Sequence, residues 1–320
     1  MMKIVILDAN TLGDDLDLTV FNDLGKVDIY GFTSKDQVID RIKDVNVIIA
    51  NKVVLNESNL QYANNLQLIC LTATGTNNVD KTYTNAHNIV VSNVVGYSTD
   101  SVAQHTFALL FYLYEKLSYY DKYVKSGTYI GDKIFTHFDK KYNEIVGKTW
   151  GIIGLGTIGK KVATIAKCFG CRIIYYSTSG KNDNREYERV ELDNLLSSSD
   201  IISIHAPLND NTDNLIGYEE FVKMKDSAVI LNLGRGRIIN ETDLTRALNE
   251  DLIAGAGLDV LEHEPINKDN PLLSIQDSIK LLITPHIAWA SVEARKRVVV
   301  EVNENIKSFQ KGIPRNVVTK

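Results

Sequence analysis

The chain has 320 residues, 44% of them hydrophobic and 23% charged, which is typical of a globular protein with two α/β domains. The formal net charge of −5 offers no basic face, so the sequence predicts no nucleic-acid partner and no membrane partner. The N-terminal run Lys3–Leu7 is too short for a signal peptide or a membrane span, and only three cysteines are present, so we expect a cytoplasmic protein.

The first part of the chain alternates short β-branched runs with polar segments of helical period. This alternation predicts a sheet of buried parallel strands with helices between them. The predicted strands are Lys3–Leu7, Val47–Ala50, Leu66–Cys70 and Ile89–Ser92.

A long helix is predicted next, beginning in a cluster of capping residues at Ser98–Ser101 and continuing to Leu117. It is apolar almost all round, so we expect it to be buried on most sides. The following stretch, Tyr119–Tyr142, is expected to be loop-like and holds seven aromatic side chains. Such aromatic density suggests an interface with a second copy. An arm folded back on its own domain is the alternative.

A second series of strands begins at Trp150. Six strands with intervening helices are typical of a complete doubly wound dinucleotide-binding fold. The last helix, Val292–Gln310, is expected to pack back on the first domain and make that domain discontinuous. The fold class predicted is therefore α/β, with two Rossmann-like or flavodoxin-like domains and parallel sheets. The strands of the second series are Trp150–Ile153, Arg172–Tyr176, Asp200–Ile204, Ala228–Asn232, Ala254–Leu258 and Lys280–Ile283.

A G-x-G-x-x-G motif follows the first strand of this series and opens a helical pattern. Gly154 suits the tight turn, Gly156 allows a pyrophosphate to approach, and Gly159 allows close helix–sheet packing. The first helical amides, at Thr157 and Ile158, would face the anion with the favourable end of the helix dipole. This context predicts a dinucleotide site.

Dinucleotide folds that use NAD usually carry an acidic residue at the end of the second strand, where it holds the ribose. This sequence has Ser177 there, followed by Thr178 and Lys181, with Asp183 a little further on. A carboxylate would repel a 2′-phosphate, whereas hydroxyls and a lysine tolerate one. The cofactor is therefore expected to be NAD or NADP, with the preference open.

Three later segments follow strands and supply an arginine, carboxylates and a histidine to one sheet edge. Reduction of a ketone needs a proton donor for the developing alkoxide and a cation for a substrate carboxylate. A histidine paired with a carboxylate meets the first need, and a forked guanidinium meets the second. The three segments are Asn232–Gly236, Gly257–Pro265 and Thr284–Trp289.

Motifs along nearly the whole chain resemble the D-isomer-specific 2-hydroxyacid dehydrogenases, in particular their glycerate dehydrogenase (hydroxypyruvate reductase) branch. Taken together, these motifs are highly specific. They are ATGTNNVD (73–80), NVVGYSTDSVAQHTFA (93–108), GLGTIG (154–159), HAPL (205–208), NLGRGRIIN (232–240), GLDVLEHEP (257–265) and TPHIAWAS (284–291).

The resemblance implies a role for four residues in or beside the reaction. Arg235 would bind the substrate carboxylate and polarise its carbonyl group. His286 would be the acid–base and Glu264 its partner. Asp259 would hold the nicotinamide carboxamide.

The resemblance also implies a domain plan, with residues 1–97 and 288–320 as substrate domain and 98–287 as dinucleotide-binding domain. A homodimer is implied as the active form. The backbone of Thr74, Gly75 and Thr76 would bind the substrate carboxylate, and His205 and Pro207 would line the cofactor.

Other polar residues near these motifs are given structural roles. His105, inside the long helix, is expected to be a packing residue with its polar atoms satisfied, with a substrate contact as the alternative. Glu262 and His263 are expected to be peripheral, and Arg237 is expected to face solvent or a cofactor phosphate. No pair of histidines has the spacing of zinc ligands, so no metal is expected.

Pocket polarity suggests the substrate. Asn51 and Lys52 follow a strand at its carboxyl edge and give a polar wall that suits the 3-hydroxyl of hydroxypyruvate, while Trp289 would limit the size of the pocket. A solvated Lys52 and a packing role for Trp289 are the alternatives. The rival functions are a dehydrogenase for lactate or another 2-hydroxy acid, and a non-enzymatic dinucleotide-sensing regulator on the same fold.

Overall fold

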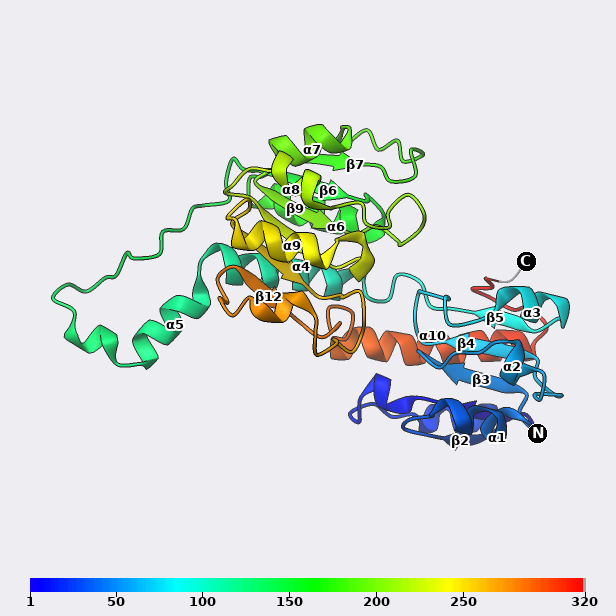
Figure 1. Cartoon of the computed structure of the whole chain (residues 1–320). Helices are drawn as coiled ribbons and strands as arrows, with labels where there is room; N and C mark the ends of the chain where they lie inside the picture. Colours follow the sequence, from blue (N-terminus) through cyan, green and yellow to red (C-terminus); the bar gives the residue numbers. More distant parts are fainter. Residues whose placement is uncertain (319–320) are drawn as a thin grey trace. The chain divides into compact units, whose positions relative to one another are not determined.

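The computed structural model describes residues 1–318, which form two compact units (Figure 1). Among the described residues, unit 1 consists of residues 1–98 and 290–318, and unit 2 consists of Thr99–Trp289. Unit 1 is therefore built from both ends of the chain. No helix among the described residues is long and apolar enough to cross a membrane.

Unit 1 contains a five-stranded parallel sheet with the order β2-β1-β3-β4-β5. Every residue of β3 and β4 is buried, as expected for parallel strands covered on both faces. The edge strand β2 was missed from the sequence because it is mostly exposed and mixes charged with apolar residues. The strands are β1 Lys3–Ile6, β2 Lys26–Ile29, β3 Val47–Ala50, β4 Leu68–Leu71 and β5 Val90–Ser92.

Short helices and one long helix cover this sheet. The long helix α10 (Val292–Gln310) has the predicted bounds and packs against β4 of the same unit, so the chain does return to its first sheet. Its N-terminus is capped by Ser291, whose hydroxyl accepts from the amide of Ala294. The other helices are η1 Ala9–Leu12, η2 Thr19–Leu24, η3 Lys35–Gln37, α1 Val38–Ile42, α2 Glu57–Leu60 and α3 Lys81–Ala86.

Unit 2 contains a seven-stranded parallel sheet with the order β12-β11-β10-β9-β6-β7-β8. All six strands predicted for this part of the chain are present. The additional strand, β8, has only two residues at the sheet edge and gave no sequence signal. The strands are β6 Thr149–Ile153, β7 Arg172–Tyr176, β8 Glu188–Arg189, β9 Ile201–Ile204, β10 Val229–Asn232, β11 Gly255–Leu258 and β12 Leu281–Ile283.

Two hydrophobic cores sandwich this sheet. Successive strand residues alternate between them, so that Ile201 packs with α4 and α6 on one face while Ile202 packs with α7, α8 and α9 on the other. α4 contributes most of one core, which explains its apolar surface. The helices are α4 Thr99–Tyr114, α5 Leu117–Lys125, α6 Thr157–Cys168, α7 Leu192–Ser198, α8 Tyr218–Lys223, α9 Glu241–Asn249, η4 Thr128–Gly131, η5 Gly236–Ile238 and η6 Pro271–Ser274.

The segment Tyr119–Tyr142 is not loop-like throughout, because α5 and η4 occupy its first half. Tyr123 stacks on His137 with ring centroids 3.7 Å apart, and the Tyr119 hydroxyl lies 2.8 Å from His137 Nε2. The aromatic cluster therefore packs within the segment itself. Figure 1 shows α5 and the residues after it extending away from the seven-stranded sheet. We call residues 117–146 the arm; its exposed apolar side chains are Leu117, Val124, Tyr129, Ile130, Ile134, Phe135, Phe138, Tyr142 and Val146.

Candidate active site

The register of the seven-stranded sheet places the expected site residues at one edge. Ile153, Ile204, Asn232, Leu258 and Ile283 lie side by side as Cα partners on five neighbouring strands. The phosphate loop begins at Gly154, the arginine loop follows Asn232 and the histidine loop begins at Thr284, so each directly follows this row. The phosphate loop, the arginine loop and the histidine loop therefore meet at the carboxyl edge, where α/β folds bind their ligands.

Glu264 and His286 form a short hydrogen-bonded pair. His286 Nδ1 lies 2.6 Å from Glu264 Oε2, and the other carboxylate oxygen accepts from the backbone amide of Leu261 at 3.0 Å. Both side chains are partly exposed. Because Nδ1 is engaged with the carboxylate, Nε2 is the ring nitrogen available for proton transfer.

Asp259 is buried and fixes the segment that carries His286. Its carboxylate accepts from the backbone amides of Ile287 and Ala288, each at 2.9 Å, and from the hydroxyl of Thr284 at 2.7 Å. These hydrogen bonds hold the chain on both sides of His286. The expected contact between Asp259 and the nicotinamide carboxamide is still a prediction.

Arg235 lies in a tight loop after β10. The Asn232 side chain braces this loop by accepting from the amide of Gly234 and donating to the carbonyl of Arg235, both at 3.0 Å. The Arg235 guanidinium is exposed and donates to the Gly234 carbonyl at 2.7 Å. The neighbouring Arg237 instead forms an ion pair of 2.5 Å with Asp213. Arg235 is thus the arginine of this loop for which no ion pair is found among the described residues.

Two glycines of the phosphate loop are required by close contacts. Gly154 has a φ of +92°, and a Cβ there would lie 2.9 Å from the Cα of Ala206. A Cβ at Gly159 would lie 2.4 Å from the carbonyl oxygen of Gly154, so only glycine lets α6 start this close to the loop. These contacts match the turn and packing roles that the motif predicts.

The middle glycine has the opposite environment. A Cβ at Gly156 would meet nothing within 4 Å, so the backbone is open there. Thr157 and Ile158 follow in the first turn of α6, whose amides have no acceptor within a helix. An open backbone in front of these donors fits a dinucleotide pyrophosphate.

His205 follows β9 and has both ring nitrogens buried without a hydrogen-bond partner. Burial lowers the pKa of His205 to about 3, so its imidazole is neutral at physiological pH. Buried polar atoms normally have partners, and a bound ligand can supply one. Pro207, two residues on, is exposed at the same edge. Both placements fit residues that line a cofactor.

The loop after β7 contacts the phosphate loop. Ser177 is buried, and its hydroxyl accepts from the backbone amide of Asn182 at 3.2 Å. Asn182 in turn donates from its side-chain amide to the carbonyl of Leu155, inside the phosphate loop, at 2.6 Å. Lys181 is exposed and Thr178 is partly exposed. Asn182 is therefore the loop residue that touches the glycine motif, which the sequence did not indicate.

At the corresponding edge of unit 1, Asp8 holds the loop after β3. The buried Asp8 carboxylate accepts from the backbone amides of Asn51, Lys52 and Val53 at distances of 2.7 to 3.3 Å. Burial raises the pKa of Asp8, although these hydrogen bonds oppose the rise. The Asn51 side chain is buried and Lys52 is exposed, so Lys52 is better placed than Asn51 to meet a ligand.

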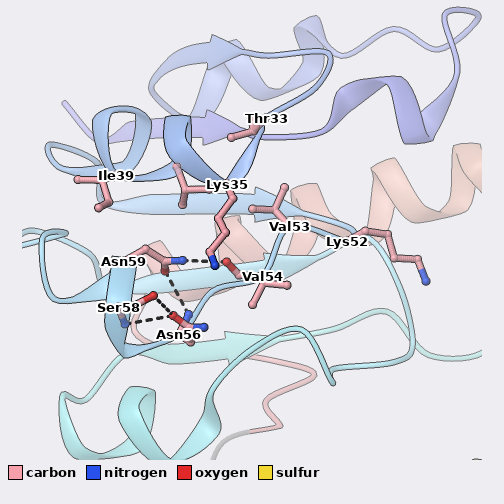
Figure 2. A pocket seen from close by; sticks show the side chains of 10 residues that line it. Thr33, Lys35, Ile39, Lys52, Val53, Val54, Asn56, Ser58 and Asn59 are labelled. Carbon is pink, nitrogen blue, oxygen red and sulfur yellow. Dashed lines mark hydrogen bonds between the residues drawn. The ribbon is translucent and has the colours of Figure 1, made fainter. Parts of the chain in front are cut away.

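Lys52 also lines an open groove of about 460 Å³ at this edge (Figure 2). In Figure 2 the Lys52 side chain points away from the end of the groove formed by Asn56 and Asn59. Two lysines and no carboxylates line the groove. The lining residues are Thr33, Lys35, Val38, Ile39, Lys52, Val53, Val54, Asn56, Ser58 and Asn59.

The loop of Thr74, Gly75 and Thr76 follows β4 in unit 1. Asn93 donates to the Thr74 carbonyl at 2.7 Å, and the Thr74 hydroxyl donates to the Val94 carbonyl at 2.8 Å. These bonds fix the loop beside the end of β5. Its expected contact with a substrate carboxylate is still a prediction.

The remaining expectations concern side chains near the histidine loop. His105 lies 3.0 Å from the hydroxyl of Thr284 and 3.6 Å from Asp259, so it has polar partners inside unit 2. Trp289 is partly buried against the core formed by α4 and α6. Glu262 and His263 are exposed.

Comparison with known proteins identifies relatives over the full length. A family model described as "D-isomer specific 2-hydroxyacid dehydrogenase, NAD binding domain" matches residues 107–288. A hydroxypyruvate reductase of Blautia hydrogenotrophica is 38% identical over 327 residues, covering 100% of each chain. A glycerate dehydrogenase of Methylorubrum extorquens is 35% identical over 317 residues, covering 99% of this chain and 98% of the relative. The solved structure of the acyclic imino acid reductase Bsp5 in complex with NADPH and D-Arg is 31% identical, with a TM-score of 0.88 over 99% of this chain and 100% of that one.

Proposed function

The chain belongs to the D-isomer-specific 2-hydroxyacid dehydrogenase family, and on that premise we propose that it reduces hydroxypyruvate to D-glycerate and glyoxylate to glycolate. The observation that carries the proposal is the Glu264–His286 pair. Its Oε2 and Nδ1 atoms lie 2.6 Å apart at the carboxyl edge of the seven-stranded sheet. Two relatives named hydroxypyruvate reductase and glycerate dehydrogenase support this choice of substrate.

The chemistry assigns one task to each side chain. A reduced nicotinamide, when bound, supplies the hydride to the carbonyl carbon. His286 donates a proton from Nε2 to the carbonyl oxygen, and Glu264 stabilises the imidazolium that precedes this transfer. Arg235 binds the substrate carboxylate and polarises the carbonyl, for which a planar fork of donors is suited.

The cofactor is a nicotinamide dinucleotide, since the matching family model is an NAD-binding domain and a similar structure holds NADPH. We propose that both NADH and NADPH are used. Ser177 puts no negative charge beside the 2′ position, and the exposed Lys181 belongs to the same loop. The other proposed cofactor contacts are Gly154, Gly156, Thr157, Ile158, Gly159, Thr178, His205, Pro207 and Asp259.

On the substrate side we propose that Lys52 provides polarity for the 3-hydroxyl of hydroxypyruvate, and that the backbone of Thr74–Thr76 assists Arg235 with the carboxylate. The exposed Lys52 and its fixed backbone support the first assignment. We expect Asn51 and Trp289 to contribute less to substrate binding, because Asn51 is buried and Trp289 packs against the core of unit 2. In this proposal residues 1–97 and 288–320 form the substrate domain and 98–287 the dinucleotide-binding domain.

The experiment is a panel of 2-keto acids with purified protein, read at the nicotinamide absorbance with NADH and with NADPH. We expect kcat/KM to be highest for hydroxypyruvate, then glyoxylate, with pyruvate and 2-ketoisocaproate well below, since a site built for a hydroxyl discriminates against analogues that lack it. A preference for pyruvate or 2-ketoisocaproate would overturn the substrate assignment but not the reaction class. No turnover of any 2-keto acid would overturn the function.

The cofactor proposal has a matched pair of variants. Ser177→Asp adds a carboxylate at the expected ribose position and should shift the preference toward NADH by about fivefold or more, since like charges in contact oppose binding by roughly 1 kcal/mol or more. Ser179→Asp adds the same charge two residues away in the same loop and serves as control. A wild type that already excludes NADPH as strongly as Ser177→Asp contradicts the proposal.

We further propose a homodimer that uses α4 and the arm, in a cytoplasmic protein. Ile130 is 89% and Phe135 91% exposed, and a patch of such side chains commonly marks an interface. Light scattering should show a dimer at micromolar concentration, and Phe135→Glu should shift it toward monomer. Ile313→Glu, which changes a 73% exposed side chain in unit 1, is the control. A wild-type monomer at micromolar concentration rejects the dimer.

A further inference from the structure

The segment that carries His286 is attached at both ends to α4. Ser101 Oγ donates to the carbonyl of Ala288 at 2.6 Å, and His105 Nε2 lies 3.0 Å from the hydroxyl of Thr284. Ser101 and His105 are four residues apart and therefore occupy the same face of the helix on successive turns. Thr284 and Ala288 lie on either side of His286. One helix face thus holds the segment before and after this histidine.

The backbone between these two attachments is in an unusual conformation. His286 has a φ of +54°, in the left-handed region that side chains other than glycine rarely adopt. Its amide donates to the carbonyl of Thr284, only two residues back, at 3.0 Å. Such a conformation persists only where surrounding contacts impose it. Because this turn directs the imidazole to Glu264, its maintenance matters for the pair.

A hydrogen-bonded chain connects His105 to the same segment. Thr284 Oγ1 donates to Asp259 at 2.7 Å, so the lone pair left on that hydroxyl can accept from His105 Nε2–H. Asp259 in turn accepts from the amides of Ile287 and Ala288 at 2.9 Å. Removing His105 would leave the Thr284 hydroxyl with one partner fewer and Asp259 with one polar neighbour fewer.

The chemical state of His105 agrees with a structural donor. Burial lowers the pKa of His105, while the nearby Asp259 carboxylate opposes that shift. A neutral imidazole that donates from Nε2 satisfies the geometry without adding a charge to the site. His105 therefore has a place in the site other than contact with substrate.

We propose that α4 is a positioning element for the acid–base histidine. Ser101 and His105 hold the backbone on both sides of His286 in its left-handed turn, so that His286 Nδ1 stays on Glu264 and Nε2 stays on the reacting carbonyl. Neither side chain touches the reacting atoms in this account. The proposal rests on the proposed function for its kinetic consequence, and on the geometry of unit 2 alone for its structural one.

The kinetic experiment compares His105→Ala and Ser101→Ala with His105→Gln and Ser101→Thr. The alanine variants should lower kcat about tenfold or more, since small displacements of a catalytic group are costly. The KM for the keto acid and the Kd for NADH should stay within about twofold, because no ligand contact is lost. Gln and Thr keep a donor at about the same reach and should restore most of kcat. Gln104→Ala, at an exposed position of the same helix, is the control.

A spectroscopic readout separates this proposal from the proposed function. Proton NMR of the wild type should show a strongly downfield resonance from the Nδ1–H of His286 bonded to Glu264, assigned by its loss in His286→Gln. His105→Ala should weaken or shift this resonance and His105→Gln should retain it, whether or not any keto acid is turned over. An unchanged resonance together with unchanged kcat in both alanine variants overturns the proposal. A raised KM with unchanged kcat in His105→Ala overturns it in favour of a substrate contact.

Discussion

At the carboxyl edge of each sheet, a buried aspartate accepts hydrogen bonds from the backbone amides of a neighbouring loop. In unit 1, Asp8 lies two residues after β1 and accepts from three consecutive amides of the loop after β3. In unit 2, Asp259 directly follows β11 and accepts from two consecutive amides of the loop after β12. Each buried carboxylate therefore holds the backbone of a neighbouring strand's loop, and each loop presents a candidate functional side chain, Lys52 in one unit and His286 in the other.

The Asp8 and Asp259 carboxylates differ in their surroundings. Asp8 is satisfied by backbone amides, and burial raises its pKa. Asp259 adds the Thr284 hydroxyl and the nearby His105, which link it to α4. The loop of unit 1 is held by Asp8 and by Asn78, whose side-chain amide donates to the Val53 carbonyl at 2.9 Å, whereas the network that holds the loop of unit 2 extends to α4. This difference agrees with the proposed function, in which the unit 2 edge performs the proton transfer and the unit 1 edge selects the substrate. General acid–base catalysis requires the more accurate geometry of the two.

Removing the side chain that each loop presents should give the largest contrast. His286→Ala should lower kcat by about 10²- to 10⁴-fold with NADH binding retained, as for loss of a general acid–base group. Lys52→Met keeps the length of the side chain and should raise KM for hydroxypyruvate while kcat changes only a few-fold. Steady-state kinetics and fluorescence titration of NADH measure both. Comparable kcat values for His286→Ala and wild type would remove His286 from its role.

Arg235→Lys tests the arginine at the unit 2 edge and should have the next largest effect on the steady-state kinetics. Lysine is a point charge and does not reproduce a planar fork of donors, so KM should rise and kcat should fall together, by roughly tenfold each. The same kinetic panel measures it, with Arg237→Lys, in the ion pair with Asp213, as control. An unchanged KM would mean that Thr74–Thr76 bind the carboxylate without Arg235.

Replacement of Asp8 should have only a small effect on the free energy of unfolding. A raised pKa means that the folded state favours protonated Asp8, a stabilisation that is lost as pH rises through that pKa, so the buried charge is a net cost at neutral pH. Asp8→Asn should therefore cost only about 1 kcal/mol of unfolding free energy, since relief of this charge offsets part of the lost hydrogen bonds. Urea unfolding at pH 7 measures it, and a loss above about 3 kcal/mol would show that the charge is favourable there.

The smallest effect concerns acid stability at the unit 2 edge. His205 has a folded pKa of about 3 and an ordinary value of 6.5, so between these values the unfolded chain binds a proton that the folded chain does not. The stabilisation present above pH 6.5 is lost as pH falls toward 3, with a slope of at most about 1.4 kcal/mol per pH unit. His205→Gln should flatten Tm between pH 6.5 and 4 relative to wild type, whereas His87→Gln, at an exposed site, should not. Parallel curves for all three proteins contradict the assignment.

Much of the fold could be predicted because buried parallel strands leave a strong signal. Runs such as Val47–Ala50 and the six strands from Trp150 onward are apolar on both faces. The edge strands gave little signal because one is largely exposed and the other has two residues. The sequence predicted a loop where α5 lies. The tyrosines of this helix stack on His137, and a local pattern does not indicate such a contact.

The site shows the same division between local and long-range information. The glycine motif and the row of strand ends follow from local pattern, so the phosphate loop could be located from the sequence. The bonds from Asp259, Asn182 and Asp8 to other loops join residues that no motif connects. For Asp8 a signal did exist, since an aspartate directly after a buried strand lies at the ligand-binding edge. For Asn182 the loop gave no such indication.

Ala206 links two of the loops at this edge in a way that bears on motion. A Cβ at Gly154 would lie 2.9 Å from the Ala206 backbone, and a Cβ at Gly234 would lie 2.8 Å from the Ala206 carbonyl oxygen, so the chain at Ala206 is wedged between both glycines. The phosphate loop and the arginine loop therefore both pack against Ala206, and we expect their motions to be coupled. Their amides should exchange with solvent deuterium as one cooperative unit, more slowly than those of the arm.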